Sequence, residues 1–366
     1  MPHTTPAQVW VLGATGRSGG AIAAKLAERG AAVTLVGRDA ARLEAAAAPL
    51  GGRTVVADSP SAMATAIRRE RPAVVVNTVG PFQNTAAPIA DAALDAGQYL
   101  DLANDIATVR GLLGRDADAR RNGNTLVTGA GFGVTATESL AMRLTDGHPP
   151  ALSVRVDMIP SIASTEGVVG EALAGSFVEG MPGMPGGGRF QGRRIADGRL
   201  AKASVGGRPT PLTTPDGDEV ITAMMPLGEL LAAANATKAR FVESASSEAP
   251  SGRLARLIMP AMFLLHIAPL RRFAMRRIAA IKTPERPMPR AHSWAHARAE
   301  WADGAVREGW LRLPNASTVT VAVATEVALR LLAGERRAGA YTPAALFGST
   351  LIESCHGVYL DAEVLQ

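Results

Sequence analysis

The chain has 366 residues, of which 47% are hydrophobic and 19% are charged, so it can bury a large core and is long enough for two domains. Its net charge of +5 is mild for this length and comes without zinc-ligand spacing or an aromatic-studded basic strand, which argues against a nucleic-acid partner. A single cysteine excludes an intrachain disulfide, and the N-terminus has no secretory signal, so we expect a cytoplasmic protein.

Up to Gly131, short apolar runs alternate with helical stretches. The predicted strands are Val9–Leu12, Ala32–Val36, Arg53–Ala57, Ala73–Asn77, Tyr99–Leu102 and Thr125–Thr128. The predicted helices are Ala21–Arg29, Ala40–Ala48, Ser61–Arg69 and Thr85–Ala96. Continuous runs of Val and Leu indicate strands buried on both faces, so they predict a parallel sheet with helices on each side. Right-handed crossovers then give an α/β, doubly wound Rossmann arrangement.

Beyond Gly131 the pattern changes to isolated strands and loops. Two alternating runs flank an Asp303-Gly304 turn, which is typical of a hairpin. The remaining strand candidates are Leu152–Ile159, Val220–Met224 and Arg240–Val242. Met181–Gly192 is predicted as a loop rich in Gly and Pro, and Thr318–Leu332 as a last helix. We expect a Rossmann domain at 1–149 and an α+β substrate domain with an antiparallel sheet at 150–317. We also expect a C-terminal helix and tail at 318–366 that packs back on the Rossmann domain.

The strongest local motif lies between the first predicted strand and the first helix. It reads Gly13, Ala14, Thr15, Gly16, Arg17, Ser18, Gly19. Glycines there permit a tight turn, let the backbone approach a diphosphate, and let the helix pack close to the sheet. The helix N-terminus presents free N–H groups and a positive dipole end to the phosphates. The motif therefore predicts a dinucleotide site.

The choice of dinucleotide is made at the end of the second strand, where NAD-specific sites carry an acidic residue. Here Gly37 and Arg38 stand instead, and a guanidinium suits a 2′-phosphate. Arg17 adds a second positive charge, whereas Asp39, which follows at once, keeps NAD open. We favour NADP(H).

Two further loops fall at the carboxyl ends of predicted strands. The fourth strand leads into Thr78, Val79, Gly80, Pro81 and Phe82, which we expect near the ribose and nicotinamide. Asp58, after the third strand, is placed either to contact the adenine or to cap a helix.

These residues together resemble the saccharopine dehydrogenase-like family of NADP-binding oxidoreductases. The similar stretches are GATGRSGG at 13–20, VGR at 36–38, NTVGPF at 77–82, DAGQYLDL at 95–102, Gly131-Phe132, Gly309–Pro314 and TPAALFG at 342–348. The resemblance covers the first ~140 residues well and the last ~70 loosely. It implies NADPH-dependent reduction, and the family includes trans-acting enoyl reductases for polyketide lipids.

The chain departs from the family pattern at two places close to the presumed active site. Ala103-Asn104-Asp105 stands where the family has Thr-Gly-Glu, and Ala136-Thr137-Glu138 stands where it has Pro-Ser-Asp. Amino-acid substrates are therefore in doubt, and we expect a small or carrier-tethered substrate that is more apolar.

A reduced C=O or C=C bond needs a proton donor, whereas an iminium needs little acid help. The candidate donors are Tyr99, His292, His296 and Tyr341, of which we select Tyr99 and His296, and Arg298 could bind a carboxylate or a carrier phosphate. His292 and His296 lie on one strand about 13 Å apart, which is too far for shared metal coordination, so we predict no metal site.

An apolar stretch, Leu257–Leu270, precedes the basic cluster Arg271, Arg272, Arg276 and Arg277. It is too short to span a bilayer, so it is a buried segment, a lid, or a peripheral membrane contact through 257–277. The leading functional hypothesis is an NADPH-dependent reductase. The alternative is a non-catalytic NADP(H)-binding redox sensor or scaffold, and either protein is compatible with a homodimer.

Overall fold

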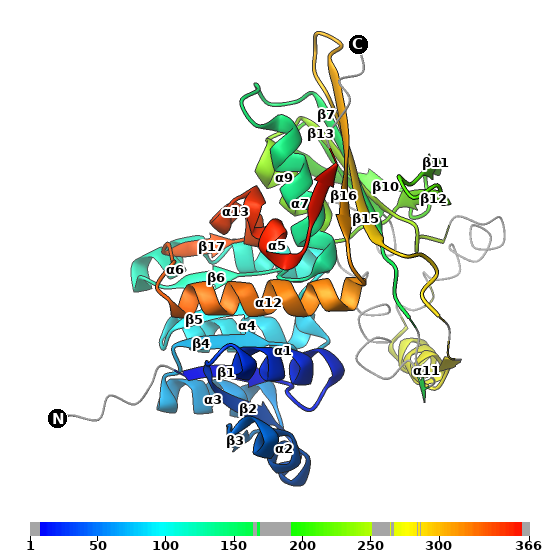
Figure 1. Ribbon diagram of the computed structural model, residues 1–366. Coiled ribbons are helices and arrows are strands. Elements are labelled where there is room, and N and C mark those ends of the chain that lie inside the picture. Colours follow the sequence, from blue (N-terminus) through cyan, green and yellow to red (C-terminus); the bar gives the residue numbers. More distant parts are fainter. Residues whose placement is uncertain are drawn as a thin grey trace. The chain divides into compact units, whose positions relative to one another are not determined.

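The computed structural model describes residues 8–163, 167–168, 192–250, 264, 267–283, 285 and 287–360 (Figure 1). The chain divides into two compact units. Unit 1 comprises Met1–Ala103, Thr108–Gly131 and Thr320–Leu346, and unit 2 comprises Asn104–Ala107, Phe132–Val319 and Phe347–Gln366. These units differ from the predicted domains at 1–149, 150–317 and 318–366. The helix after Gly131 belongs to unit 2, because it packs on strands of that unit.

Unit 1 is built on a seven-stranded sheet in the order β17-β6-β5-β4-β1-β2-β3, with every pair parallel. The strands are β1 (Gln8–Leu12), β2 (Ala32–Gly37), β3 (Arg53–Val56), β4 (Val74–Asn77), β5 (Gln98–Asp101), β6 (Thr125–Val127) and β17 (Gly339–Tyr341). The predicted doubly wound Rossmann sheet is confirmed, and β17 extends it beyond β6. Chain order reverses between the neighbours β1 and β4, which is where such folds bind ligands.

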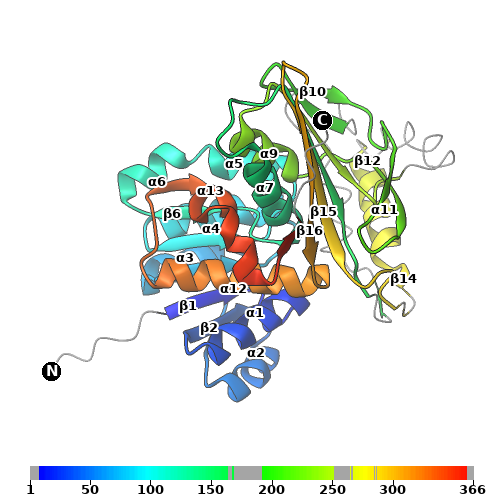
Figure 2. The same cartoon turned by 45° about the horizontal axis from the view of Figure 1, so that its top comes forward.

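The helices of unit 1 connect successive strands. They are α1 (Arg17–Glu28), α2 (Ala40–Ala47), α3 (Pro60–Glu70), α4 (Phe82–Leu94) and α6 (Asp116–Asn122), with the one-turn η1 (Ala48–Leu50) after α2. The helices α5 (Ile106–Leu113), α12 (Ala316–Leu332) and α13 (Pro343–Phe347) each have residues in both units. α1 and α12 lie side by side (Figures 1 and 2), and Arg29 at the end of α1 lies 3.9 Å from Glu326 of α12.

Unit 2 contains a nine-stranded sheet, in which β10-β9-β13-β7-β15-β16-β18 form the main path and β12 joins β13 to β11. The strands are β7 (Ser153–Ile159), β9 (Gly192–Ala196), β10 (Arg199–Ala203), β11 (Thr210–Thr213), β12 (Glu219–Met224), β13 (Phe241–Ser246), β15 (Ser293–Glu300), β16 (Val306–Leu313) and β18 (Val358–Leu360). The pair β13–β7 is parallel and the others are antiparallel, so the sheet is mixed rather than purely antiparallel. Two short strands, β8 (Gly167–Val168) and β14 (Lys282–Thr283), pair separately.

The helices of unit 2 are α7 (Phe132–Thr145), α9 (Glu229–Thr237) and α11 (Ala268–Ala279), with η3 (Ser349–Cys355). α7 and α9 lie together on one side of the long strands (Figure 2). A Cβ on Gly133 of α7 would lie 2.6 Å from Sδ of Met158, so Met158 and its partner Ala295 face α7. Strand alternation places Asp157 and His296 on the opposite face.

The predicted loop Met181–Gly192 lies outside the described residues, except for Gly192, which begins β9. Most of the apolar stretch 257–270 also lies outside them, and its described part is Leu264 and residues 267–270.

Candidate functional site

The glycine motif forms the turn between β1 and α1. Gly13 has a φ of +78°, which residues with a Cβ rarely adopt. A Cβ on Gly19 would lie 2.7 Å from Oγ1 of Thr78 and closer still to the carbonyl oxygen of Gly13. Both positions therefore require glycine, and the close approach holds the start of α1 against the ends of β1 and β4.

The first turn of α1 is free of side-chain caps. Gly16 is its N-cap residue and offers no side chain to the amides that follow. Arg17 and Ser18 are exposed, Thr15 is half-buried and Ala14 is buried. Free amides and the positive end of the helix dipole suit a phosphate group at this point.

Two neighbouring charged residues, Arg38 and Asp39, follow β2 and make different contacts. Arg38 is exposed and forms no hydrogen bond or ion pair with another described residue, and it follows the buried Gly37. The carboxylate of Asp39 instead accepts a hydrogen bond of 3.1 Å from the N–H of Arg42 and caps α2. Arg42 also donates to the carbonyl oxygen of Thr15 over 3.3 Å, a contact that no motif in the sequence predicts. The free cation suits a 2′-phosphate, and the acidic residue is already engaged.

The loop after β4 is tied directly to the glycine turn. Thr78 donates its hydroxyl to the carbonyl oxygen of Leu12 over 2.7 Å. The carbonyl oxygen of Val79 accepts from Thr85, the Gly80–Pro81 peptide is cis, and the half-buried Phe82 packs partly on the core.

Asp58 follows β3 and is exposed. The cap of α3 is Ser59, which accepts from the N–H of Ala62, so Asp58 is not the helix cap. Its contact with adenine stays a prediction.

All of these cofactor candidates lie in unit 1, at the carboxyl ends of β1, β2, β3 and β4. The glycine turn has no room for a Cβ, the first turn of α1 has no side-chain cap, and the exposed Arg38 pairs with none of the described residues. Together these features fit a dinucleotide with a 2′-phosphate.

Tyr99, a predicted proton donor, lies in β5 and is fully buried. Its hydroxyl accepts from Nδ2 of Asn77 over 3.1 Å and donates to Oδ2 of Asp101 over 2.9 Å. Burial and the neighbouring Asp101 raise the pKa of Tyr99 well above its usual value. The hydroxyl is occupied within the sheet, so its role as a donor stays a prediction that this geometry does not favour.

Asp101 ties together the loops that follow β5 and β6. Its Oδ1 accepts from the N–H groups of Ala103 and Gly129 and from the hydroxyl of Thr128, all within 3.1 Å. Burial raises the pKa of Asp101 to about 6, although these hydrogen bonds oppose the rise.

His296, the other predicted donor, lies in unit 2 between two carboxylates. Its Nδ1 is 2.9 Å from Oδ2 of Asp157, and its Nε2 is 2.9 Å from Oε1 of Glu308. The imidazole also packs against Trp310, with the ring centroids 4.6 Å apart and the ring planes tilted by 45°. Its side chain is only 3% exposed, and both ring nitrogens are engaged.

The charges around His296 alternate in sign. Arg155 donates to Asp157 over 3.0 Å, and the hydroxyl of Thr222 donates to the same carboxylate over 2.6 Å. Burial opposes the charged imidazolium, but the hydrogen bonds to Asp157 and Glu308 outweigh it and raise the pKa of His296. Burial acts to raise the pKa of Asp157, but the hydrogen bond from His296 prevails and lowers it. The two carboxylates therefore favour the charged form of His296.

A second titratable group in unit 2, Glu229, was not predicted from the sequence. It opens α9, is fully buried, and its Oε1 accepts from Nδ2 of Asn104 over 3.1 Å. Its Oε2 has no hydrogen-bond partner among the described residues. A Cβ on Gly133 would collide with Oε1, so the glycine makes room for the carboxyl. Burial raises the pKa of Glu229 to about 7.

Of the remaining candidates, His292 and Tyr341 join neither cluster, whereas Arg298 reaches Glu308 beside His296. His292 lies 2.7 Å from Asp216, and the Tyr341 hydroxyl donates to the carbonyl oxygen of Ala338 over 2.9 Å. Arg298 is half exposed and lies 3.8 Å from Glu308.

Comparison with known proteins agrees with this geometry. Residues 9–127 match the model of the saccharopine dehydrogenase NADP-binding domain. The structure matches apo saccharopine dehydrogenase (L-Glu forming) from Saccharomyces cerevisiae with a TM-score of 0.60 and 12% identity, over 98% of this chain and 100% of that one. At this identity, the match shows a shared fold.

Two further matches are limited to about a third of this chain. A short-chain dehydrogenase from Sphingobium yanoikuyae in complex with NADPH has a TM-score of 0.27 and 18% identity, over 34% of this chain and 71% of that one. The NADPH-dependent reductase YwfH, involved in bacilysin biosynthesis, has a TM-score of 0.30 and 12% identity, over 34% and 76%. No curated protein matches the chain. Residues 9–127 are therefore a saccharopine dehydrogenase NADP-binding domain, through which the protein binds NADP(H).

Proposed function

We propose that this protein is an NADPH-dependent reductase that transfers hydride to a C=C, C=N or C=O bond of a small or carrier-tethered, fairly apolar substrate. The observation that carries the proposal is the glycine turn, where Gly13 and Gly19 leave room for a diphosphate, together with the exposed Arg38 beyond β2, which pairs with none of the described residues. NADPH, when bound, supplies the hydride. The first-turn amides of α1 hold its diphosphate, and Arg38 holds its 2′-phosphate.

The reduction of a carbonyl or an activated alkene also needs a proton. Glu229 suits this role, because its Oε2 has no partner among the described residues and its pKa lies near neutrality. We add Glu229 to Tyr99 and His296 as a candidate donor. The hydroxyl of Tyr99 and both nitrogens of His296 are already engaged by neighbours, which favours Glu229.

Calorimetric titration with NADPH and NADH tests the cofactor site. We expect the wild type to prefer NADPH, and Arg38→Gln to weaken NADPH binding roughly 10- to 100-fold, the value of a charge-assisted hydrogen bond, without changing NADH binding. Arg29→Gln is a matched control, because Arg29 is an exposed arginine at the other end of α1. A chain that binds neither nucleotide would refute the site.

NADPH absorbance tests the reaction, with acyl-carrier-linked enones and with imines as substrates. We expect turnover with one of these classes, and Glu229→Gln should lower kcat while leaving NADPH affinity unchanged. Turnover of free amino acids with oxoacids alone would overturn the apolar substrate. NADPH binding without any turnover would favour a redox sensor.

A further inference from the structure

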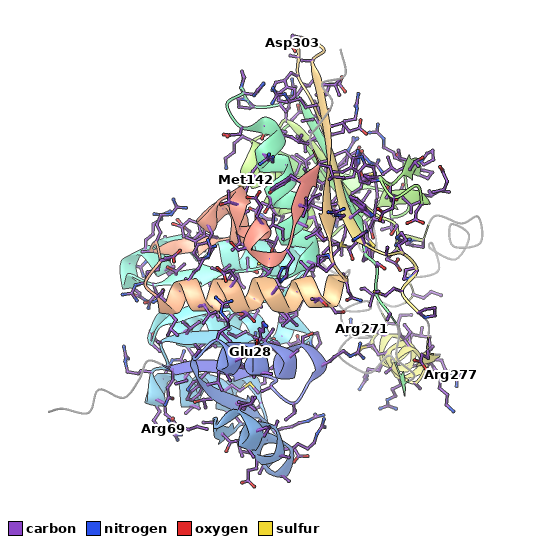
Figure 3. The ribbon with its side chains drawn as sticks, in the orientation of Figure 1. Glu28, Arg69, Met142, Arg271, Arg277 and Asp303 are labelled. Carbon is purple, nitrogen blue, oxygen red and sulfur yellow. The ribbon has the colours of Figure 1, made fainter. Side chains whose placement is uncertain are left out.

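Helix α11 stands out because none of its residues is buried. Four of its twelve residues are arginines, namely Arg271, Arg272, Arg276 and Arg277, and it has no acidic residue. Figure 3 labels Arg271 and Arg277 on this helix. A helix without a buried face contributes little to the core of its own unit.

Large apolar side chains are exposed along the same segment. Of the ten exposed large hydrophobic residues in the described part of the chain, five fall between Leu264 and Ile281. Ile267, Leu270 and Phe273 recur every third residue and are 50%, 42% and 63% exposed. This spacing places Leu270 and Phe273 on one side of the helix, and Ile267 precedes them as its N-cap residue. Arginine side chains flank them, and the guanidinium of Arg277 lies 6.0 Å above the ring of Phe273.

The charges of α11 are not neutralised by the described part of the protein. None of its four arginines forms a salt bridge with a described residue. The last turn of α3 also carries two consecutive arginines, but there Arg68 pairs with Asp95 over 2.9 Å and Arg69 with Glu70 over 2.8 Å. The positive charge of α11 is therefore available to an anionic partner.

We propose that α11 is an interfacial helix that binds an anionic lipid surface. Its arginines contact the phosphate headgroups, and Ile267, Leu270 and Phe273 enter the boundary with the acyl chains. A bilayer interface offers anionic phosphates and an apolar boundary side by side, which matches the neighbouring arginines and exposed apolar side chains of this segment. No helix among the described residues is long and apolar enough to cross a membrane. We therefore propose that α11 lies on the surface of the bilayer and does not span it.

Vesicle co-sedimentation of the full chain tests the proposal. The probes are vesicles of phosphatidylcholine alone and of phosphatidylcholine mixed with phosphatidylglycerol. We expect binding to the anionic vesicles only, and weaker binding as salt rises. Each arginine near the surface should contribute about fivefold, so R276Q/R277Q should weaken binding about 30-fold. The matched control R68Q/R69Q, on α3, should bind like the wild type.

The variant L270S/F273S separates a bilayer from a purely electrostatic partner. It keeps all four arginines, and we expect it to lose binding to the anionic vesicles. Because the mutated side chains are exposed, we expect every variant to bind NADPH with wild-type affinity. Unchanged NADPH affinity then shows that the variant is folded. Equal binding by L270S/F273S and the wild type would overturn the proposed entry of the apolar side chains into the bilayer and leave a purely electrostatic contact. Absence of wild-type binding to the anionic vesicles would also overturn it.

Discussion

We expect the substitution Glu229→Gln to stabilise the protein above neutral pH and to leave its stability nearly unchanged in mild acid. The Glu229 carboxyl is fully buried, and its single described hydrogen-bond donor from another residue is Nδ2 of Asn104, a neutral amide. Burial without a cation nearby raises the pKa of Glu229 from 4.5 to about 7. Gln keeps the shape of the side chain and the oxygen that accepts from Asn104, but it never carries a charge.

The size of the effect follows from the two pKa values. Between pH 4.5 and about 7 the folded state binds more protons than the unfolded state, so the free energy of unfolding falls as pH rises. Since a difference of one in pKa corresponds to about 1.4 kcal/mol, the loss is complete above pH 7 and amounts to roughly 3 kcal/mol. Gln at position 229 binds no proton, so this fall in the free energy of unfolding does not occur in the variant.

Urea unfolding at about pH 5 and about pH 8 measures the difference. Tryptophan fluorescence reports mainly on unit 2, because Trp294, Trp301 and Trp310 lie there and Trp10 lies in unit 1. The control Glu243→Gln should destabilise the protein rather than stabilise it, since it removes the ion-pair partner of Arg208. A gap between wild type and Glu229→Gln that is the same at both pH values would refute the argument.

Three further outcomes follow from the contacts. Gly19→Ala should weaken NADPH binding at least about tenfold in calorimetry, because its Cβ would meet Oγ1 of Thr78; unchanged affinity would show that the turn can relax. Thr78→Val should lower the free energy of unfolding by about 1 kcal/mol in urea titrations, since the hydroxyl that binds the Leu12 carbonyl oxygen is lost; no change would show that this hydrogen bond does not contribute to stability. His296 should show imidazolium nitrogen shifts by NMR at neutral pH, and Asp157→Asn should lower its pKa; a neutral ring in the wild type would contradict the ion-pair geometry.

The first six strands of unit 1 were predictable because each holds a short run rich in apolar residues that ends at a turn or helix signal. β17 was not, because Gly339–Tyr341 has only three residues and pairs with β6, more than two hundred positions away. The mixed direction of the unit 2 sheet was also missed. Side-chain alternation along β13 and β7 is the same whether two strands run parallel or antiparallel.

The cofactor loop was visible in the sequence, since its glycines, strand and helix are contiguous. The engagement of Asp39 was not, because it depends on whether that carboxylate caps α2. Asn104 was noticed as a departure from the family, but Glu229 lies 125 positions further on and no local pattern marks it. Asp157 and Glu308 fall on predicted strands, and their meeting with His296 depends on strand register.

The two buried titratable clusters of unit 2 lie on opposite faces of one sheet and differ in how their charge is compensated. Around His296, Arg155, Asp157, the imidazolium and Glu308 alternate in sign, so a proton lost from the ring would leave two buried or half-buried carboxylates without their shared cation. Glu229 has a neutral amide on one oxygen and no described partner on the other, so it gains or loses a proton at small cost near neutral pH. Chemistry that consumes a proton in each cycle needs a group of the second kind. Equal burial therefore leads to different roles: His296 holds the polar face of the sheet together, and Glu229 is the better candidate for proton transfer.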